Sequence, residues 1–386
     1  MKQLKIMSIF GTRPEAIKMA PVIKVLEEDH RIKSLVTVTG QHRSLLDQVL
    51  ELFSLNPDYD LQIMESGQSL AQITTKILSN LEDVISQEEP DLVLVHGDTS
   101  TTFVSALTSF YQQLKIGHIE AGLRSGNKYA PYPEEINRRL TGVLADLHFT
   151  PSATNRSNLL AEGIPDANIF LTGNTVIDAL EMMVEPTYQF QDSTLQQLDF
   201  PNKKIILVTA HRRENLGQPL VNICRAVEDV VALSSEVEVV WPLHPNPKIK
   251  DKVYDSLANL SRVHLIKPLP YQEFINLIAR SYLVVTDSGG LQEEAPSLDK
   301  PVLVLRETTE RSAALQAGTI ELVGTQQEGI RAGILKLLTN QRKYETMANT
   351  PNPYGDGQAS QRIVEAILYS WGYHAIRPTE FEPLII

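Results

Sequence analysis

The chain has 386 residues, of which 42% are hydrophobic and 21% are charged, a composition typical of a globular protein. This length exceeds one ordinary hydrophobic core and suits two domains of common size. The formal net charge of −12 argues against nucleic acid or an anionic membrane surface as the main partner. A phosphorylated ligand would therefore have to be bound by arginine and lysine residues concentrated locally.

Cysteine usage and apolar patterning indicate the compartment. Cys224 is the only cysteine, so no internal disulfide or cysteine-rich metal site is expected, and we interpret it as a small core residue. The N-terminus enters an apolar segment at once, without a long apolar stretch and cleavage site, and no run approaches the length of a membrane span. These features predict a cytoplasmic protein without membrane contact.

Apolar strands alternate with helices through the first half. The strand at 4–10 runs into FGTRPE (10–15), where Thr12 is a candidate helix cap and Arg13 and Lys18 are nearby cations. The junction lacks the GxGxxG dinucleotide fingerprint, so NAD is not supported. Further strands are expected at 35–39, 91–96, 116–119, 147–150 and 169–171, with helices at 42–53, 69–87, 102–111 and 133–145.

The second half repeats this alternation. Residues 184–203 lack strong periodicity and contain two prolines, so they are expected to lead into a second domain. Its strands are expected at 205–209, 237–241, 263–266, 282–286, 302–305 and 320–323, and a last helix at 359–369. Two doubly wound parallel sheets of the α/β class are thus predicted, with a ligand in the cleft between them at the carboxyl ends of the strands.

The strand at 282–286 leads into Ser288-Gly289-Gly290 and a helix-prone run, 291–295, stopped by proline. Such a junction presents bare backbone N–H groups and a positive helix end to an anion, and glycine lets a diphosphate approach the backbone. Glu294 is a candidate acceptor for ribose hydroxyls, and Arg311 a candidate phosphate partner. The alternative is an ordinary tight turn between strand and helix.

Four polar groups stand at strand ends or helix starts, and they are Asp98, Glu120, Glu134 and His211. Strand ends in an open α/β sheet converge on one crevice, where three carboxylates raise each other's proton affinity and suit general acid–base catalysis. A protonated histidine there stabilises an anionic leaving group.

Each of these residues also has a structural interpretation. Asp98 could cap the following helix, and Glu134 could favour a helix start. Glu120 could pair with Arg124, and His211 with the cluster at 212–214.

Eight segments, taken together, resemble the non-hydrolysing UDP-N-acetylglucosamine 2-epimerases, and they span essentially the whole chain in order. They are FGTRPEAIKMAP (10–21), HGDTSTT (96–102), HIEAGLRSG (118–126), PYPEEINRRLTG (131–142), TGNTVIDAL (172–180), AHRRENLG (210–217), TDSGGLQEEAPSL (286–298) and NPYGDGQAS (352–360). The resemblance implies the GT-B architecture, with two Rossmann-like domains and a homodimer. The domains would be 1–183, joined by a returning helix at 359–386, and 184–358.

The resemblance also implies a reaction that needs no cofactor and no metal. UDP-N-acetylglucosamine and UDP-N-acetylmannosamine would interconvert, for synthesis of cell-surface polysaccharide precursors. The anomeric C–O bond would break first, because the C2 proton has no adjacent carbonyl to acidify it. Loss of UDP and this proton would give 2-acetamidoglucal, to which UDP re-adds after protonation of the opposite face.

The family's functional positions are matched in this sequence. Asp98, Glu120 and Glu134 match its acid–base carboxylates, His211 matches the histidine that helps the departing diphosphate, and Lys18 matches a further active-site position. Which carboxylate serves which face of the sugar stays open. The matched UDP-binding positions are Arg13, Phe274 (near the uracil), Ser288, Gly289, Gly290, Glu294 and Arg311.

Bacterial relatives often bind a second, activating UDP-N-acetylglucosamine. The positions matching that site are Gln41, Gln68, Glu134, Arg212 and His244. Ser44 and Gly67 depart from the glutamine and arginine often found there, which weakens the case for tight activator binding. Leu269 replaces a glutamine of some members near the uracil.

Three other functions compete with this hypothesis. A GT-B glycosyltransferase would share the Ser-Gly-Gly run and Glu294, but it needs an acceptor site and usually one catalytic base, whereas three carboxylates favour epimerisation. A hydrolysing epimerase, which releases UDP and free N-acetylmannosamine, differs only in how water reacts with the glycal intermediate. A catalytically silent nucleotide-sugar sensor would not need the matched acid–base residues.

Overall fold

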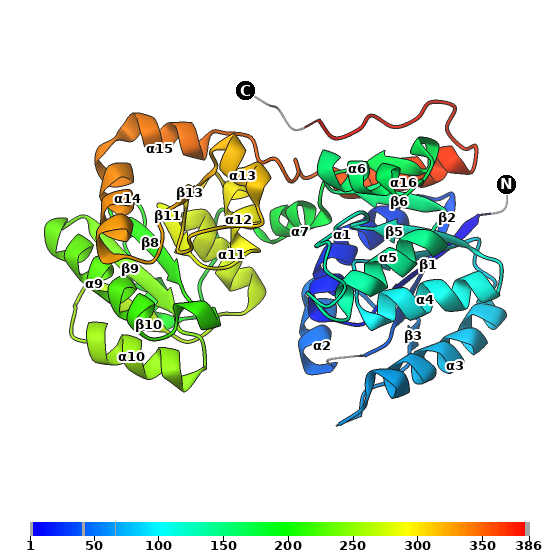
Figure 1. The fold of residues 1–386 in the computed structure, drawn as a ribbon, viewed down its shortest axis with the longest axis horizontal. Coiled ribbons are helices and arrows are strands. Elements are labelled where there is room, and N and C mark those ends of the chain that lie inside the picture. Colours follow the sequence, from blue (N-terminus) through cyan, green and yellow to red (C-terminus); the bar gives the residue numbers. More distant parts are fainter. Residues whose placement is uncertain (1–2, 41–42, 66, 383–386) are drawn as a thin grey trace. The chain divides into compact units, whose positions relative to one another are not determined.

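The computed structural model describes residues 3–40, 43–65 and 67–382, with only the backbone for residues 43–45. The chain divides into two compact units (Figure 1). Unit 1 comprises Met1–Met182 and Gly355–Glu382, and unit 2 comprises Met183–Tyr354. Each unit is built around one parallel sheet, so each carries its own set of strand ends.

The sheet of unit 1 has the order β3-β2-β1-β4-β5-β6-β7, with every neighbouring pair parallel. Its strands are β1 Leu4–Phe10, β2 Ile32–Val38, β3 Tyr59–Asp60, β4 Leu92–His96, β5 Lys115–Ile119, β6 Leu147–Thr150 and β7 Ile169–Leu171. The chain order reverses between β1 and β4, which is where ligands bind in doubly wound folds. The two-residue strand β3 is an addition to the predicted set, too short to show a periodic pattern.

Helices cover the sheet of unit 1 in two groups. Helix α4 contacts α3 and α5, whereas α1 contacts α2 and α16 (Figure 1). The helices are α1 Arg13–Glu28, α2 Arg43–Leu52, α3 Leu70–Glu88, α4 Ser100–Tyr111, α5 Glu134–Leu144, α6 Ala153–Ala161, α7 Thr175–Met183 and α16 Ala359–Ser370, with a 3-10 turn at Asp166–Asn168. The C-terminal helix α16 is anchored here, because buried Asp178 accepts the backbone N–H groups of Ala359 and Ser360.

The sheet of unit 2 has the order β10-β9-β8-β11-β12-β13 and is also parallel. Its strands are β8 Lys204–Thr209, β9 Val237–Pro242, β10 Val263–Ile266, β11 Leu283–Thr286, β12 Val302–Val304 and β13 Ile320–Leu322. Its helices are α8 Ser193–Gln196, α9 Gln218–Leu233, α10 Pro247–Leu257, α11 Tyr271–Arg280, α12 Leu291–Glu294, α13 Ser312–Ala317, α14 Gln327–Thr339 and α15 Gln341–Ala348, with 3-10 turns η2 Arg213–Asn215 and η3 Ala295–Leu298. The chain order reverses between β8 and β11, and the predicted α/β class with two doubly wound sheets is confirmed.

The glycine-rich junction after β11 differs from its prediction in one respect. Helix α12 ends at Glu294 and continues as η3, which includes Pro296, so the proline does not stop the helical path. Proline fits this place, the second residue of η3, because the first turn of a helix needs no backbone N–H donor.

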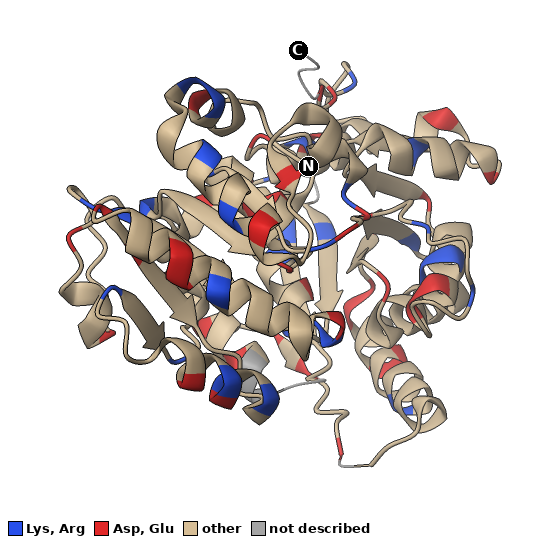
Figure 2. Ribbon diagram, turned by 60° about the vertical axis from the view of Figure 1, so that its left-hand side comes forward, with Lys and Arg blue, Asp and Glu red and all other residues tan. Residues whose placement is uncertain are grey.

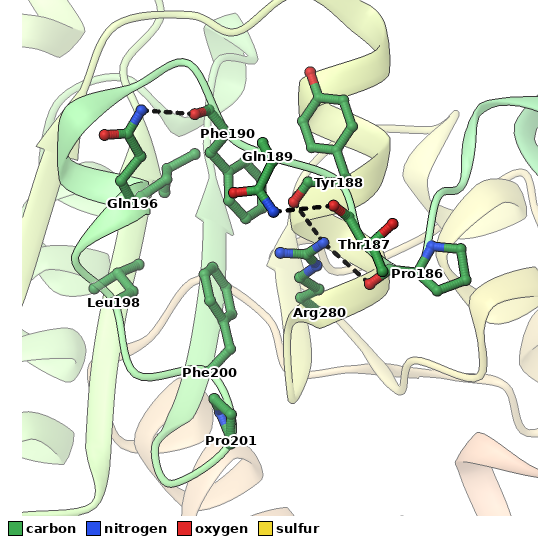
Figure 3. Close-up of a pocket in the computed structure, with 11 residues that line it drawn as sticks. Pro186, Thr187, Tyr188, Gln189, Phe190, Gln196, Leu198, Phe200, Pro201 and Arg280 are labelled. Carbon is green, nitrogen blue, oxygen red and sulfur yellow. Dashed lines mark hydrogen bonds between the residues drawn. The ribbon is translucent and has the colours of Figure 1, made fainter.

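The segment at 184–203, expected to be an irregular approach to unit 2, folds around an arginine. The Arg280 guanidinium lies over the Phe190 ring, with its carbon 5.0 Å from the ring centroid, and its Nη2 donates to the Tyr188 carbonyl at 2.7 Å (Figure 3). A pocket of about 510 Å³ lies here, lined by residues of the segment 186–201 and by Arg280. This segment is held in place by Arg280 of α11, a contact that the periodicity of the local sequence cannot predict.

The structure bears on the predictions made from the single cysteine and from the lack of a long apolar run. Cys224 is 1% exposed on α9, and burial raises the pKa of its thiol to about 11, which confirms it as an inert core residue. Lys/Arg and Asp/Glu residues are interspersed on the helices of both units (Figure 2). Among the described residues, every helix is too short or too polar to cross a membrane.

Candidate active site

The carboxyl edge of the unit 1 sheet gathers most of the predicted catalytic residues. Lys18 is on α1, Asp98 follows β4, Glu120 follows β5, and Glu134 begins α5. The Lys18 ammonium donates a hydrogen bond to Glu120 Oε1, which joins two residues 102 positions apart in the sequence. The structure thus brings together side chains from neighbouring strand ends, as a parallel sheet requires.

Glu120 is held in an unusual backbone conformation at the end of β5. Its φ of 61° lies in the left-handed region, which a residue with a side chain adopts at a cost of order 1–3 kcal/mol. Burial opposes ionisation of its carboxyl group, but the charge and hydrogen bond of Lys18, together with the charges of His96 and Arg138, lower the pKa of Glu120 to about 2. Glu120 is therefore ionised at neutral pH. The alternative that it pairs with Arg124 is wrong, because Arg124 forms a bidentate pair with Glu162 at 2.8 and 2.7 Å.

Asp98 has a different electrostatic environment and does not cap a helix. Thr99, not Asp98, caps α4, so the capping alternative is wrong. The Asp98 carboxylate accepts a hydrogen bond from Arg138 Nη2. Burial raises the pKa of Asp98, Arg138 acts against this increase, and the charges of Glu120 and Glu134 add to it. Two carboxyl groups with opposite pKa shifts at one sheet edge suit an acid–base pair.

Glu134 and Arg13 each begin a helix of unit 1. Glu134 is the first residue of α5 and is half-buried, and its negative charge helps to raise the pKa of Asp98. Arg13 is the first residue of α1, after the capping residue Thr12. Within the part of the chain that the structure describes, the Arg13 guanidinium makes no hydrogen bond or ion pair, so its donors are available for an anionic group.

Glu15 is a residue whose second role the sequence did not reveal. It is 3% exposed and accepts the backbone N–H groups of Gly11 and Thr12 at 3.0 and 2.8 Å. It also accepts hydrogen bonds from the hydroxyls of Thr99 and Thr102 at 2.6 and 3.0 Å. Its spacing from Thr12 signals a capping box, but the link to the loop bearing Asp98 depends on tertiary structure.

His96 is a second such residue, at the end of β4. It is 3% exposed, and its Nε2 atom lies 3.9 Å from Glu120 Oε2. Burial lowers the pKa of His96 to about 4, so its ring is neutral at pH 7. The neutral ring of His96 adds no positive charge at pH 7, where Lys18 and Arg138 are the cations that favour ionised Glu120.

In unit 2, His211 follows β8 and is fixed by a buried carboxylate. Asp287 is 0% exposed, and its Oδ1 atom lies 3.2 Å from His211 Nδ1. Asp287 Oδ2 accepts the backbone N–H groups of His211 and Arg212 and the side-chain amide of Asn215, each at 2.9 Å. The alternative pairing of His211 with the cluster at 212–214 is wrong. Asp287 directly follows β11, and local sequence does not predict its role.

The Ser288-Gly289-Gly290 run forms a cradle beside two polar side chains. A Cβ atom on Gly289 would lie 3.3 Å from Arg311 Cζ, and one on Gly290 would lie 3.1 Å from Glu294 Oε1. Arg311 is held by Glu293 and Glu310, each at 2.8 Å. The run thus approaches both predicted ligand-binding side chains too closely to leave room for extra atoms.

The backbone N–H groups of this cradle are only partly bare, which corrects the prediction. The Ser288 N–H donates to Thr286 Oγ1 at 2.9 Å, because that hydroxyl reaches back over the turn. The N–H groups of Gly289 and Gly290 have no partner among the described residues. Phe274 lies half-buried on α11, and none of these contacts includes it.

The residues matched to an activator site are only partly described. Gln41 and the side chain of Ser44 lie outside the described residues. Gln68, in unit 1, uses its side chain to hold its own loop, accepting the Glu65 N–H at 2.8 Å. In unit 2, the His244 ring stacks on His211 with centroids 5.9 Å apart, and Arg212 Nε donates to the Asp287 carbonyl at 2.8 Å.

Among the described residues, no group of three or more His, Cys, Asp or Glu is placed to hold a metal ion. A pocket of about 570 Å³ in unit 1 is lined by residues at the amino ends of strands, such as Asp91 and Lys115, and by the C-terminal segment around Trp371. None of the predicted site residues lines it or the pocket at Arg280.

A comparison with protein families gives the same assignment as the motifs. The family model for UDP-N-acetylglucosamine 2-epimerase matches residues 24–368. The chain belongs to this epimerase family. The resemblance drawn from the eight segments is confirmed.

Individual members of the epimerase family match over nearly their full lengths. The Bacillus subtilis UDP-N-acetylglucosamine 2-epimerase is 50% identical over 381 residues, covering 99% of each chain. A UDP co-structure of S. aureus MnaA has a TM-score of 0.85 and 46% identity, covering 99% of this chain and 100% of that one. The Neisseria meningitidis UDP-GlcNAc 2-epimerase bound to UDP-GlcNAc has a TM-score of 0.80 and 49% identity, covering 95% and 100%.

Proposed function

We propose that this protein interconverts UDP-N-acetylglucosamine and UDP-N-acetylmannosamine by inverting the configuration at C2. Full-length similarity to relatives that carry the name of this epimerase supports the activity. The observation that supports the chemistry is the pair of carboxyl groups in unit 1, ionised Glu120 and Asp98 with its raised pKa. Such a pair offers two groups of different proton affinity, as acid–base catalysis on two faces of one carbon requires.

The reaction proceeds by elimination and re-addition. The C1–O bond to the diphosphate breaks with its electron pair leaving on UDP, and the developing positive charge at C1 acidifies C2. A carboxylate then takes the C2 proton, which leaves 2-acetamidoglucal with a C1=C2 double bond. A carboxylic acid protonates C2 on the opposite face, and a diphosphate oxygen re-forms the bond to C1. Glu120 and Asp98 supply these two groups and exchange roles when the reaction reverses.

The remaining predicted residues bind the substrate and stabilise charge. His211 donates to the departing diphosphate, with its ring orientation set by Asp287. Arg13, Arg311 and the Gly289–Gly290 backbone bind phosphate oxygens, and Ser288 lies in the same run. Glu294 accepts ribose hydroxyls, Phe274 contacts the uracil, Lys18 keeps Glu120 charged, and Glu134 modulates Asp98.

Three further features complete the proposal. The protein acts as a homodimer, as its resemblance implies, and in the cytoplasm, which the lone buried thiol of Cys224 suits. Binding of an activator at Gln68, Arg212 and His244 should be weak, because Gly67 offers no cation for a phosphate. The product serves the synthesis of cell-surface polysaccharide precursors.

Proton NMR in deuterated water tests the reaction directly. With UDP-N-acetylglucosamine as substrate, the anomeric signal of UDP-N-acetylmannosamine should appear, with deuterium at C2 and little free UDP. Accumulation of UDP and free N-acetylmannosamine would instead identify a hydrolysing epimerase. An unchanged spectrum, from protein that is folded and binds UDP, would refute the proposed reaction.

The glycine cradle gives a separate prediction for nucleotide binding. Gly289→Ala should weaken UDP binding by about tenfold or more, because its Cβ presses on Arg311, and a lost charge-assisted hydrogen bond costs about 1.5–3 kcal/mol. Isothermal titration with UDP measures this change. Gly142→Ala on α5 of unit 1 controls for adding one methyl group, because its Cβ would meet its nearest atom, Arg124 Nη2, at the ordinary contact distance of 3.4 Å. Unchanged UDP affinity in Gly289→Ala would show that the nucleotide does not use this cradle.

A further inference from the structure

Arg138, on α5, is a buried cation that the residues assigned so far do not include. It is 6% exposed, and its guanidinium joins two carboxylates. Nη2 donates to Asp98 Oδ2, and Nη1 donates to Glu135 Oε2 at 3.4 Å. Its Nε atom is buried and has no hydrogen-bond partner in the described part of the chain. An arginine desolvated to this extent is stable only if its carboxylate partners stay in place.

Glu135 is the carboxylate that holds Arg138 on the side away from Asp98. It is 0% exposed and accepts the backbone N–H groups of Ser125 and Gly126 at 2.9 and 3.3 Å. Both residues belong to the loop that follows β5 and Glu120. Glu135 is therefore held by the backbone, and Arg138 is held by Glu135, three residues earlier on the same helix.

The other carboxylate bound by Arg138 is Asp98, which lies in the loop after β4. Besides the Arg138 contact to its carboxylate, the Asp98 carbonyl accepts a hydrogen bond from the Asn137 side-chain amide at 3.0 Å. Neighbouring residues of α5 thus hold both the backbone and the side chain of Asp98. One Asp98 oxygen carries the Arg138 contact, so the other is the one left for a substrate proton.

We propose that Arg138 is a positioning residue for the epimerisation, fixing the orientation and the charge state of the Asp98 carboxylate. This inference rests on the proposed function, in which Asp98 exchanges a proton with C2. Arg138 acts through Asp98 and does not itself touch the reacting atoms.

The charges around Asp98 predict the direction in which its pKa changes when Arg138 is removed. The groups that face it are Arg138 and Glu134 from α5 and Glu120 from the end of β5, while Lys18 and His96 act on Glu120. Burial and the two glutamates raise the pKa of Asp98, and Arg138 opposes them. Removing the cation must therefore shift the pKa of Asp98 further upward. The limb of the pH–rate profile that reports Asp98 should move to higher pH in either protonation role.

The test compares wild type with Arg138→Met and Arg138→Lys, following C2 deuterium exchange between pH 5 and 10. Arg138→Met should lose about tenfold to a hundredfold in kcat, the effect of one hydrogen bond to a charged group, with a smaller change in KM. One limb of its profile should move to higher pH, and Arg138→Lys should restore part of both. Arg156→Met is the matched control, because Arg156 also bridges two carboxylates of unit 1, Asp166 and Glu380.

A purely structural role for Arg138 gives different results. If Arg138 only neutralises buried Glu135, then the double variant Glu135→Gln/Arg138→Met should recover wild-type kcat, and the pH limbs of Arg138→Met should stay in place. Either result would overturn the inference, whereas a double variant that stays slow with a displaced limb supports it. Absence of exchange in wild-type protein would instead refute the proposed function. Titration of ¹³C-labelled aspartate signals, assigned with Asp98→Asn, reports the upward shift independently of turnover.

Discussion

Glu120→Gln should reduce the kcat of epimerisation by about 10²–10⁴-fold, the range expected for loss of a general acid–base group. Glutamine keeps the size of the side chain but can neither accept the C2 proton nor carry the charge that Lys18 stabilises. Deuterium incorporation at C2 should fall in parallel with product formation, because both require the same proton transfer. The measurement is single-turnover NMR in deuterated water with UDP-N-acetylglucosamine.

A control separates this catalytic effect from a general loss of charge. Glu27→Gln removes another carboxylate of unit 1, one that pairs with Lys24 at the surface. Its kcat should stay within about threefold of wild type, because exposed ion pairs contribute little to stability. If Glu120→Gln kept more than a tenth of wild-type turnover, Glu120 would not be one of the two groups that exchange protons with C2.

Much of the fold was predictable because buried parallel strands are continuous apolar runs. Strands β1, β6, β7 and β10 begin and end where the sequence predicts, and most others differ by one residue at an end. β2 is the exception, since it begins at Ile32, three residues before the predicted start, in a stretch where Lys33 and Ser34 interrupt the apolar pattern. Local sequence therefore defines the strands best where both faces are buried.

The candidate site was predictable to the extent that it lies at strand ends. The alternation of strands and helices identifies the carboxyl edge, so Asp98, Glu120 and His211 follow from their places after β4, β5 and β8. The roles proposed for them come from the resemblance to the epimerase family. Arg13 and Lys18 follow in the same way, from their places beside the first glycine junction.

The partners of these residues were not predictable, because they depend on contacts distant in sequence. Arg138 meets Asp98 across 40 residues, and Asp287 meets His211 across 76. Arg138 lies inside a quoted segment without any local sign that it is buried. The unassigned partners set the pKa of Asp98 and the orientation of His211, so they determine how the predicted residues function.

Asp287→Asn should damage both stability and turnover in unit 2. The carboxylate accepts hydrogen bonds from the backbone N–H groups of His211 and Arg212 and from Asn215. An asparagine amide has one acceptor oxygen and would turn an N–H group toward one of these donors. Leaving a buried donor without an acceptor costs about 1–3 kcal/mol, so the free energy of unfolding should fall by about 1–3 kcal/mol in urea denaturation.

The loss of turnover in Asp287→Asn should act through His211, and a double-mutant cycle can show it. Asp287→Asn and His211→Asn should each reduce kcat by about a hundredfold, as for loss of one transition-state donor. The double variant should then be no slower than His211→Asn, because Asp287 only orients a ring that is already gone. Asp192→Asn is the matched control, since Asp192 accepts two backbone N–H groups at the start of α8 and should affect stability alone. Additive losses in the cycle would mean that Asp287 supports turnover by a route independent of His211, such as the position of the Ser288–Gly290 cradle that follows it.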